Sequence, residues 1–216
     1  LNRSAYNRAN QVGPAETGFR GNAKNLDLNR DFLKCDSENA KSFNRLFSNW
    51  KPDVFLDTHT TNGSDHQYAI TLIPTNPASL PLPMNDFLRS EMLPYLYENM
   101  RETPYEMTPY VSWMNQNPGE GITMTMESAR YSTGYSRVHH SYGFMTENHV
   151  YKSYPDRVLS VYHFMKVLAA FTSGNSNKII QSRANAIHEA IESNLYALDY
   201  EVDTTQYELF NFKGYE

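Results

Sequence analysis

Acidic and imidazole side chains occur at two points where apolar stretches of the chain end. His59 follows the apolar residues 54–56 and stands two residues after Asp57, while Glu147 follows the apolar stretch 142–145. A neutral imidazole is a good zinc ligand, and a nearby carboxylate commonly orients it. A carboxylate at the end of a buried strand loses hydration, which raises its pKa and suits general acid–base catalysis. Taken singly, both side chains are also compatible with structural roles, in a hydrogen bond or an ion pair.

A third polar group lies in the stretch "NLDLNRDF", residues 25–32. Its residues follow neither the alternation of a strand nor the period of an amphipathic helix. Arg30 follows Asn29, and Arg20 stands ten residues earlier in a sequence rich in Gly and Asn. Because a guanidinium can bind a carboxylate through two parallel hydrogen bonds, these residues predict a clamp for a carboxylate-bearing substrate. The alternative is that both arginines are ordinary surface residues.

Three further histidines, His139, His140 and His149, form a second group near the predicted catalytic carboxylate. They lack the helical i, i+4 spacing and the cysteines that mark common zinc motifs. Solvated positions, or roles in orienting other side chains, are therefore favoured over a separate metal site.

Periodicity and turn residues indicate which elements must position these groups. Amphipathic or apolar helices are expected at 36–50, 84–100 (broken at Pro94), 156–171 and 177–198. Strands are expected within 53–61, 67–75, 121–130 and 141–149, and loops at 1–25 and 74–83. This order predicts an α/β fold with a mixed, mainly parallel sheet flanked by helices. Functional sites of such sheets gather at the carboxyl ends of the strands, where the polar groups stand.

Composition excludes several classes of function. The net charge of −5 gives no basic footprint for nucleic acid, so no nucleic-acid partner is expected. No run of 18 apolar residues is present, and no membrane span is expected. Cys35 is the single cysteine of the chain, which excludes an internal disulfide.

The stretches "FRGNAKNLDLNRDF", "FLDTHTT" and "GFMTENH", in this order and before a long helix, resemble the zinc carboxypeptidase family (M14 metallopeptidases), in particular bacterial-type members. The resemblance spans residues 20–172. It implies a partial zinc-carboxypeptidase-like fold. It also implies hydrolysis of C-terminal peptide bonds by a zinc-activated water with a glutamate general base. The implied partner is a peptide with a free C-terminal carboxylate.

The resemblance also implies roles for single residues in catalysis and substrate binding. Glu147 would be the general base, and Arg20 would polarise the scissile carbonyl, with Arg8 in "YNRANQ" as the alternative. Asn29 and Arg30 would bind the terminal carboxylate of the substrate.

The remaining implied roles concern the metal and the closure of the site. His59 would be the third zinc ligand, and Asp27 would orient a zinc-bound histidine. Tyr135, or as the alternative Tyr131, would close over the substrate.

One departure from the family pattern sets further expectations. The HxxE motif that supplies the first two zinc ligands does not occur in residues 1–58. We therefore expect a fragment that lacks the first part of its domain, binds no stoichiometric zinc and is inactive alone. Residues 1–172 would be the C-terminal part of the catalytic domain, and residues 173–216 a helical extension toward a missing region. Dimerisation through the surface exposed by truncation is expected, as is a secreted or periplasmic parent whose signal segment lies outside this chain.

Two other functions fit the same sequence. One is an amidohydrolase or deacylase of the same fold, which would act on cell-wall peptides or acyl-amino acids. The other is a binding domain that keeps the fold without the chemistry. Activity on peptides with free rather than amidated C-termini separates the carboxypeptidase from the amidohydrolase.

Overall fold

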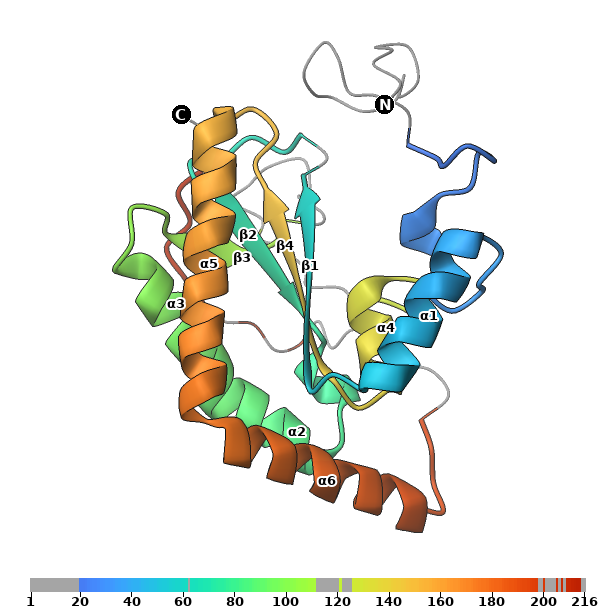
Figure 1. Ribbon diagram of the computed structural model, residues 1–216. Coiled ribbons are helices and arrows are strands. Elements are labelled where there is room, and N and C mark those ends of the chain that lie inside the picture. Colours follow the sequence, from blue (N-terminus) through green and yellow to red (C-terminus); the bar gives the residue numbers. More distant parts are fainter. Residues whose placement is uncertain are drawn as a thin grey trace.

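The computed structural model describes residues 20–61, 63–111, 121, 126–197, 200, 205, 207 and 209–214. Four strands of this part form one sheet in the order β1-β4-β2-β3 (Figure 1). They are β1 Val54–Thr60, β2 Ile70–Pro74, β3 Met107–Pro109 and β4 Tyr142–Asn148. β1 and β4 are parallel, β2 and β3 are parallel, and β4 runs antiparallel to β2. The predicted α/β fold with a mixed, mostly parallel sheet flanked by helices is thereby confirmed.

Most helices of the described residues follow the predicted pattern, but the helix over 132–138 was not expected. They are α1 Glu38–Trp50, α2 Leu82–Phe87, α3 Leu93–Arg101, α4 Ser132–Val138, α5 Tyr154–Gly174 and α6 Ser176–Glu192. The Ser37 hydroxyl accepts a hydrogen bond from the Ala40 N–H at 3.0 Å and so caps the start of α1. Lys51 adopts a left-handed conformation with φ of 47° and ends that helix. The helices predicted at 36–50, 156–171 and 177–198 are therefore confirmed, the last ending earlier than expected.

Two predicted segments differ from the structure. The expected loop 74–83 contains a 3₁₀ turn, Pro77–Ser79, and the start of α2, because prolines are tolerated in the first turn of a helix. The strand expected at 121–130 is wrong for its described residues, 121 and 126–130, which do not belong to a strand. The helix predicted over 84–100 is interrupted just before Pro94 and not at it, since a π-helical turn, Leu88–Met92, separates α2 from α3 and Pro94 lies in the first turn of α3.

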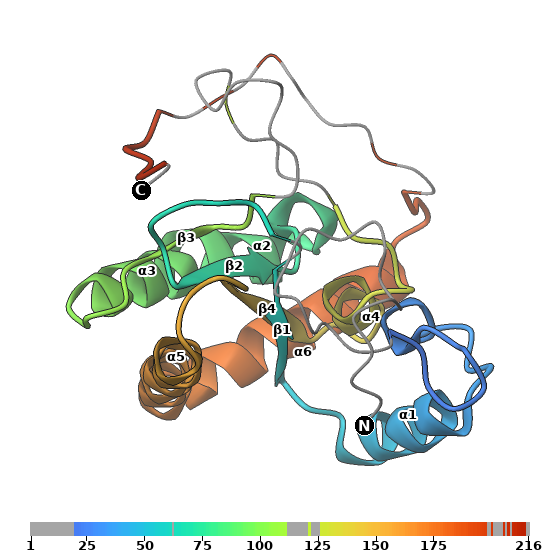
Figure 2. The same cartoon turned by 90° about the horizontal axis from the view of Figure 1, so that it is seen from above.

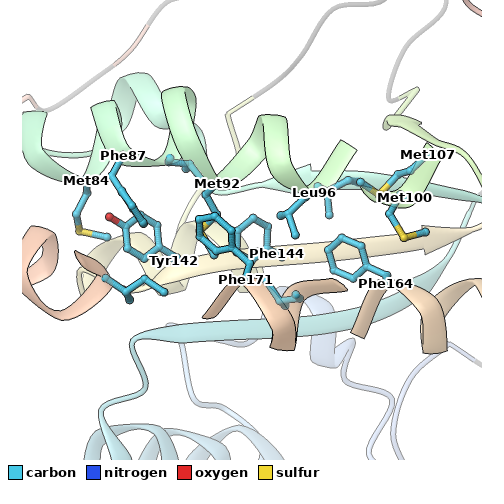
Figure 3. Close-up of a cluster of buried hydrophobic side chains, with 14 of the residues drawn as sticks. Met84, Phe87, Met92, Leu96, Met100, Met107, Tyr142, Phe144, Phe164 and Phe171 are labelled. Carbon is cyan, nitrogen blue, oxygen red and sulfur yellow. The ribbon is translucent and has the colours of Figure 1, made fainter. Parts of the chain in front are cut away.

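Side-chain alternation along β1 and β4 divides the sheet into two faces. Val54 and Leu56 of β1, together with Tyr142 and Phe144 of β4, face a large apolar core. Helices α2, α3, α5 and α6 cover that face (Figures 1 and 2). Figure 3 shows the cluster, which includes Met84, Phe87, Met92, Leu96, Met100, Met107, Phe164 and Phe171. The alternate residues of both strands must therefore point to the opposite face, toward α1 and α4.

Helix α6 contributes to the same apolar core as α2, α3 and α5. Ile179 and Ala186 lie in the apolar cluster, and the hydroxyl groups of Ser182 and Tyr142 lie 2.7 Å apart. Arg183 donates hydrogen bonds to the Lys51 carbonyl at 3.0 Å and to Asp53 at 2.8 Å. Helix α6, the first part of the expected C-terminal extension, therefore packs against the core beside α2 and β4.

The outer edge of β1 has no neighbouring strand within the described part of the chain. A groove of about 450 Å³ lies beside it, between β1, α5 and α6, and apolar residues such as Leu56, Met165 and Ile180 line it. Leu56 packs against the core helices, so the groove opens on the core side of β1 and not on the side of the polar residues. None of the described helices is long and apolar enough to cross a membrane.

Gly143 in β4 provides a test of the packing between the sheet and α4. An added Cβ would lie 2.7 Å from the Ser136 Cβ and 2.8 Å from the Thr75 hydroxyl oxygen. Gly143→Ala should therefore lower the free energy of unfolding by about 1–3 kcal/mol, as overpacking does in tight cores. Urea denaturation measures this change. Gly174→Ala is the matched control, because a Cβ there meets nothing within 4 Å, and an equal loss in both variants would contradict the account.

Candidate active site at the ends of β1 and β4

Parallel pairing of β1 and β4 brings His59 and Glu147 together from distant parts of the sequence. The two residues are direct Cα partners in the ladder. The His59 Nδ1 lies 3.8 Å from the Glu147 Oε1. Both side chains point away from the apolar core, since they follow the alternation of Phe55 and Met145.

Asp57 fixes the orientation of the His59 ring. The Asp57 Oδ2 lies 2.7 Å from the His59 Nε2. Since an ionised carboxylate can only accept, Nε2 carries the proton and the Nδ1 faces Glu147. Residues two apart on a strand share a face, so β1 itself aligns this pair.

Opposing effects set the charges of this pair. Burial lowers the pKa of His59, but the hydrogen bond to Asp57 and the charges of Asp57 and Glu147 outweigh it, so that pKa is raised. Burial raises the pKa of Asp57, but the His59 hydrogen bond and charge outweigh it and hold that pKa below its ordinary value. In the absence of metal, each of these two groups therefore stabilises the charged form of the other.

Glu147 combines burial with an unpaired oxygen. The residue is 8% exposed, and its Oε2 has no hydrogen-bond partner among the described residues. Burial, with the negative charges of Glu127 and Asp57, raises the pKa of Glu147 to about 7, although His59 and Arg20 act in the opposite direction. A carboxyl group with this pKa can both accept and return a proton near neutral pH.

The stretch "NLDLNRDF" forms a short 3₁₀ helix, Leu28–Arg30. Asp27 caps it by accepting from the Asn29 N–H at 3.0 Å, and its other oxygen lies 2.5 Å from the Arg20 Nε. Within the described part of the chain, the Asp27 carboxylate therefore contacts Asn29 and Arg20, and no hydrogen bond joins it to a histidine. In this arrangement Asp57, and not Asp27, orients the imidazole at the site.

Asp31 was not singled out from the sequence and has a structural role. It is buried and accepts hydrogen bonds from the N–H groups of Asp36 at 2.8 Å and Ser37 at 2.9 Å. These bonds hold the turn that leads into α1. The acidic and amide residues of this stretch therefore serve both the local fold and the candidate site.

Arg30 and Asn29 lie next to each other in the 3₁₀ helix, and Arg30 contacts Tyr131. The Arg30 guanidinium lies over the Tyr131 ring, 4.5 Å from its centroid, and donates to the Asn29 carbonyl at 2.8 Å. The Asn29 side-chain oxygen is buried without a hydrogen-bond partner among the described residues. Arg20 lies near enough to Glu147 for its charge to lower the pKa of that carboxyl group.

Glu127 is a residue near the site that the sequence analysis missed. Its Oε2 accepts a hydrogen bond from the Thr133 hydroxyl at 2.7 Å. Burial raises the pKa of Glu127 above its ordinary value, although the nearby charges of His59 and Arg30 act in the opposite direction. Gly134 is needed here, because an added Cβ would lie 2.4 Å from the Glu127 carbonyl oxygen. In the sequence, Glu127 could be noticed only as the acidic residue in "TMESAR" and through the glycine that follows it, and neither has a spacing that indicates a site.

Tyr135 lies where a substrate-closing side chain cannot act. It is 1% exposed, and its hydroxyl donates to the Asn44 Oδ1 at 2.7 Å. Its ring packs in an aromatic cluster with Phe32, Phe43 and Phe47. The expected role of Tyr135 is therefore not supported by its position, which leaves Tyr131, next to Arg30. The other alternative residue, Arg8, lies outside the described residues.

The histidines of the second group do not form one cluster. His139 packs against Phe47 and Tyr135 in the aromatic cluster, with ring centroids 5.1 and 4.6 Å away. His149 is buried instead against His66, with ring centroids 4.6 Å apart. Burial and the charge of Arg183 lower the pKa of both His139 and His140.

The described residues do not fit a complete catalytic zinc site. No group of three or more His, Cys, Asp or Glu side chains within them could hold a metal ion. All seven histidines of the chain are among these residues, and His59 is the one beside Glu147. Catalytic zinc normally has three protein ligands, so His59 with its Nδ1 turned toward Glu147 supplies at most one of them.

The unusual pKa of Glu147 predicts a pH-dependent stability. Its value of about 7 in the folded protein lies above the ordinary 4.5. As pH rises from 4.5 to 7, the unfolded chain ionises first, so the folded state loses stability. Glu147→Gln should therefore raise the free energy of unfolding by about 2–3 kcal/mol at pH 8 and change it little at pH 4.5. Urea denaturation at both pH values, with exposed Glu98→Gln as control, measures this; equal effects at both pH values would contradict it.

Comparisons with known proteins support the fold. No protein-family model and no curated protein matches the chain. Among solved structures, the fold is similar to that of a metallo-carboxypeptidase from Burkholderia cenocepacia, with a TM-score of 0.51 and 13% sequence identity. The match covers 72% of this chain and 42% of that chain, so this chain spans less than half the length of the similar structure. The α/β fold thus resembles part of a metallo-carboxypeptidase.

Proposed function

We propose that this chain forms part of a metallo-carboxypeptidase-like hydrolase that cleaves C-terminal peptide bonds, with Glu147 as the general base. The observation that carries the proposal is the Asp57–His59–Glu147 arrangement at the carboxyl ends of two parallel strands. The similarity to part of a metallo-carboxypeptidase supports the same reaction class. The chain spans 42% of that structure, so the activity is proposed for the natural protein in which this chain occurs.

Glu147 would move the proton in this reaction. Its carboxylate would accept a proton from the attacking water and then deliver it to the amine that leaves. A pKa of about 7 allows both steps near neutral pH. The Oε2, which accepts no hydrogen bond from the described residues, would be the oxygen that takes part in this transfer.

Arginine side chains would bind the negative charges of the substrate and of the transition state. Arg30, held over the Tyr131 ring, and the Asn29 amide would bind the terminal carboxylate. Arg20, which lies near enough to Glu147 for its charge to lower the pKa of that residue, would stabilise the developing oxyanion. Tyr131 would cover the bound substrate from the side of Arg30.

Zinc enters this proposal through His59 alone. His59 Nδ1 would be one ligand, and Asp57 would hold the ring in the tautomer that leaves this nitrogen unprotonated. The described residues supply no complete set, so further ligands would have to come from residues outside them.

Substitution of Glu147 tests the base role. In the natural protein, Glu147→Gln should lower kcat for a peptide with a free C-terminus by about 10²–10⁴-fold and leave KM nearly unchanged, because the amide cannot take up the proton. Steady-state kinetics measures this, and Glu98→Gln on the exposed side of α3 is the control. Retained turnover in Glu147→Gln would exclude this residue as the base.

Substitution of Arg30 tests the carboxylate clamp. Arg30→Ala should raise KM about 10–100-fold for peptides with a free C-terminus, because charge-assisted hydrogen bonds are lost, and should not affect C-terminal amides. Arg130→Ala is the matched control, since this exposed guanidinium also lies beside the Tyr131 ring, 5.6 Å from its centroid. Equal KM changes for free and amidated peptides would contradict the clamp. Better turnover of amides in the unsubstituted protein would favour the amidohydrolase instead.

A further inference from the structure

The described C-terminal residues 209–214, here called the clasp, pair with the connection between β1 and β2. The Gln67 N–H donates to the Lys213 carbonyl at 3.2 Å. The Tyr68 hydroxyl accepts from the Lys213 N–H at 3.1 Å and donates to the Asn211 carbonyl at 3.3 Å. An ion pair between Lys213 and Glu106, just before β3, adds a further attachment. The clasp therefore joins the chain end to segments far away in the sequence.

The clasp closes over two buried histidines. Phe212 contacts the rings of His66 and Tyr68, with centroids 6.0 and 5.5 Å away. Beneath it, His66 packs edge-on against His149, and each of these histidines is only 1% exposed. Neither histidine takes part in the proposed chemistry.

The hydrogen bonds of this pair suit neutral imidazoles. The Tyr151 N–H faces the His149 Nδ1 at 3.1 Å, and the His66 N–H faces the His149 Nε2 at 3.2 Å. A neutral imidazole has a single acceptor nitrogen and accepts one of these two contacts, whereas an imidazolium ion has none, so protonation of His149 would remove the contact that the neutral ring accepts. The His66 Nδ1 is buried and has no hydrogen-bond partner among the described residues, so a proton there would be an unsatisfied charged donor.

We propose that the clasp is an acid-released element, which holds the connection 64–68 closed at neutral pH and detaches when the His66–His149 pair takes up a proton. Protonation places a positive charge among aromatic rings and beside a second imidazole. Opening of the clasp removes Phe212 from His66 and admits water, which solvates that charge. This inference does not depend on the proposed function.

The charged groups around His66 determine the direction of the effect. Burial, His149 and Lys152 lower the pKa of His66 to about 4, and Asp65 and a backbone hydrogen bond at Tyr68 oppose this. Asp65 also lies 3.4 Å from the His149 Nε2. The open form, with His66 in water, binds a proton near the ordinary value of 6.5. As pH falls from 6.5 toward 4, protons therefore bind the open form and draw the equilibrium toward it.

Release of the clasp would act close to the candidate site. His149 stands two residues after Glu147, and the connection that carries His66 begins directly after β1, which carries His59. The Thr61 N–H donates to the Asn148 carbonyl at 2.8 Å, and the Val150 N–H donates to the Thr61 hydroxyl at 3.2 Å. Acid release would thus loosen the segments that follow both site residues.

Amide hydrogen exchange of the 216-residue chain, followed by NMR, tests the proposal. The protection of the Gln67 and Lys213 amides should fall roughly 60-fold between pH 7 and pH 4.5. This factor follows from a His66 pKa of 6.5 in the open form and about 4 in the closed form. The Phe144 amide, in the middle of β4, reports global unfolding and should lose far less protection. Protection of Gln67 and Lys213 that stays constant over this range, or falls only together with that of Phe144, would overturn the proposal.

Variants assign the effect to His66. His66→Phe keeps an aromatic ring and should abolish the pH-dependent loss, while exposed His188→Gln, also lacking one titrating histidine, should keep it. Glu106→Gln removes the partner of Lys213 and should weaken the clasp at both pH values without abolishing the pH dependence. If His66→Phe does not fold, the NMR titration of His66 in the unsubstituted chain decides. Titration near 6.5 with the clasp still protected would overturn the proposal.

Discussion

The candidate site depends on the parallel register between β1 and β4. This register alone places His59 opposite Glu147, and the alternation of the strands turns both side chains, with Asp57, away from the apolar core. A slip of one residue would exchange the two faces and send these polar groups among the side chains around Phe144 and Phe164. The free energy of burying the core therefore also fixes the geometry of the polar group on the other face.

That polar group combines a buried carboxyl group with an oriented imidazole, and the described residues around it supply no complete set of metal ligands. Burial and neighbouring carboxylates bring the pKa of Glu147 to about 7, while Asp57 orients the single imidazole beside it. Three acidic side chains thus lie close enough to His59 for their charges to raise its pKa: Asp57, Glu127 and Glu147. The clasp over the His66–His149 pair lies beyond the ends of the same two strands, so its proposed release would make the segments that follow these strands sensitive to pH.

Much of the fold and part of the site could be predicted from the sequence. The short apolar runs before His59 and Glu147 indicated two buried strands, and parallel strand ends in α/β folds converge, so their meeting was predictable. Side-chain direction was not: Tyr135 stands in a tyrosine-rich stretch near Glu147, yet α4 turns it into the aromatic cluster against Asn44. Glu127 was missed because tertiary contacts with Thr133 and the close approach at Gly134, rather than a local pattern, bring it near His59.

The adjacency of His59 and Glu147 is the central claim, and the titration of His59 tests it most directly. NMR measurement of the His59 imidazole in the metal-free chain should give a pKa above the ordinary 6.5, since Asp57 and Glu147 both favour the cation. In Glu147→Gln, the loss of one neighbouring negative charge should lower this pKa, whereas Glu98→Gln should not. An unchanged His59 pKa in Glu147→Gln would contradict the placement of the two side chains.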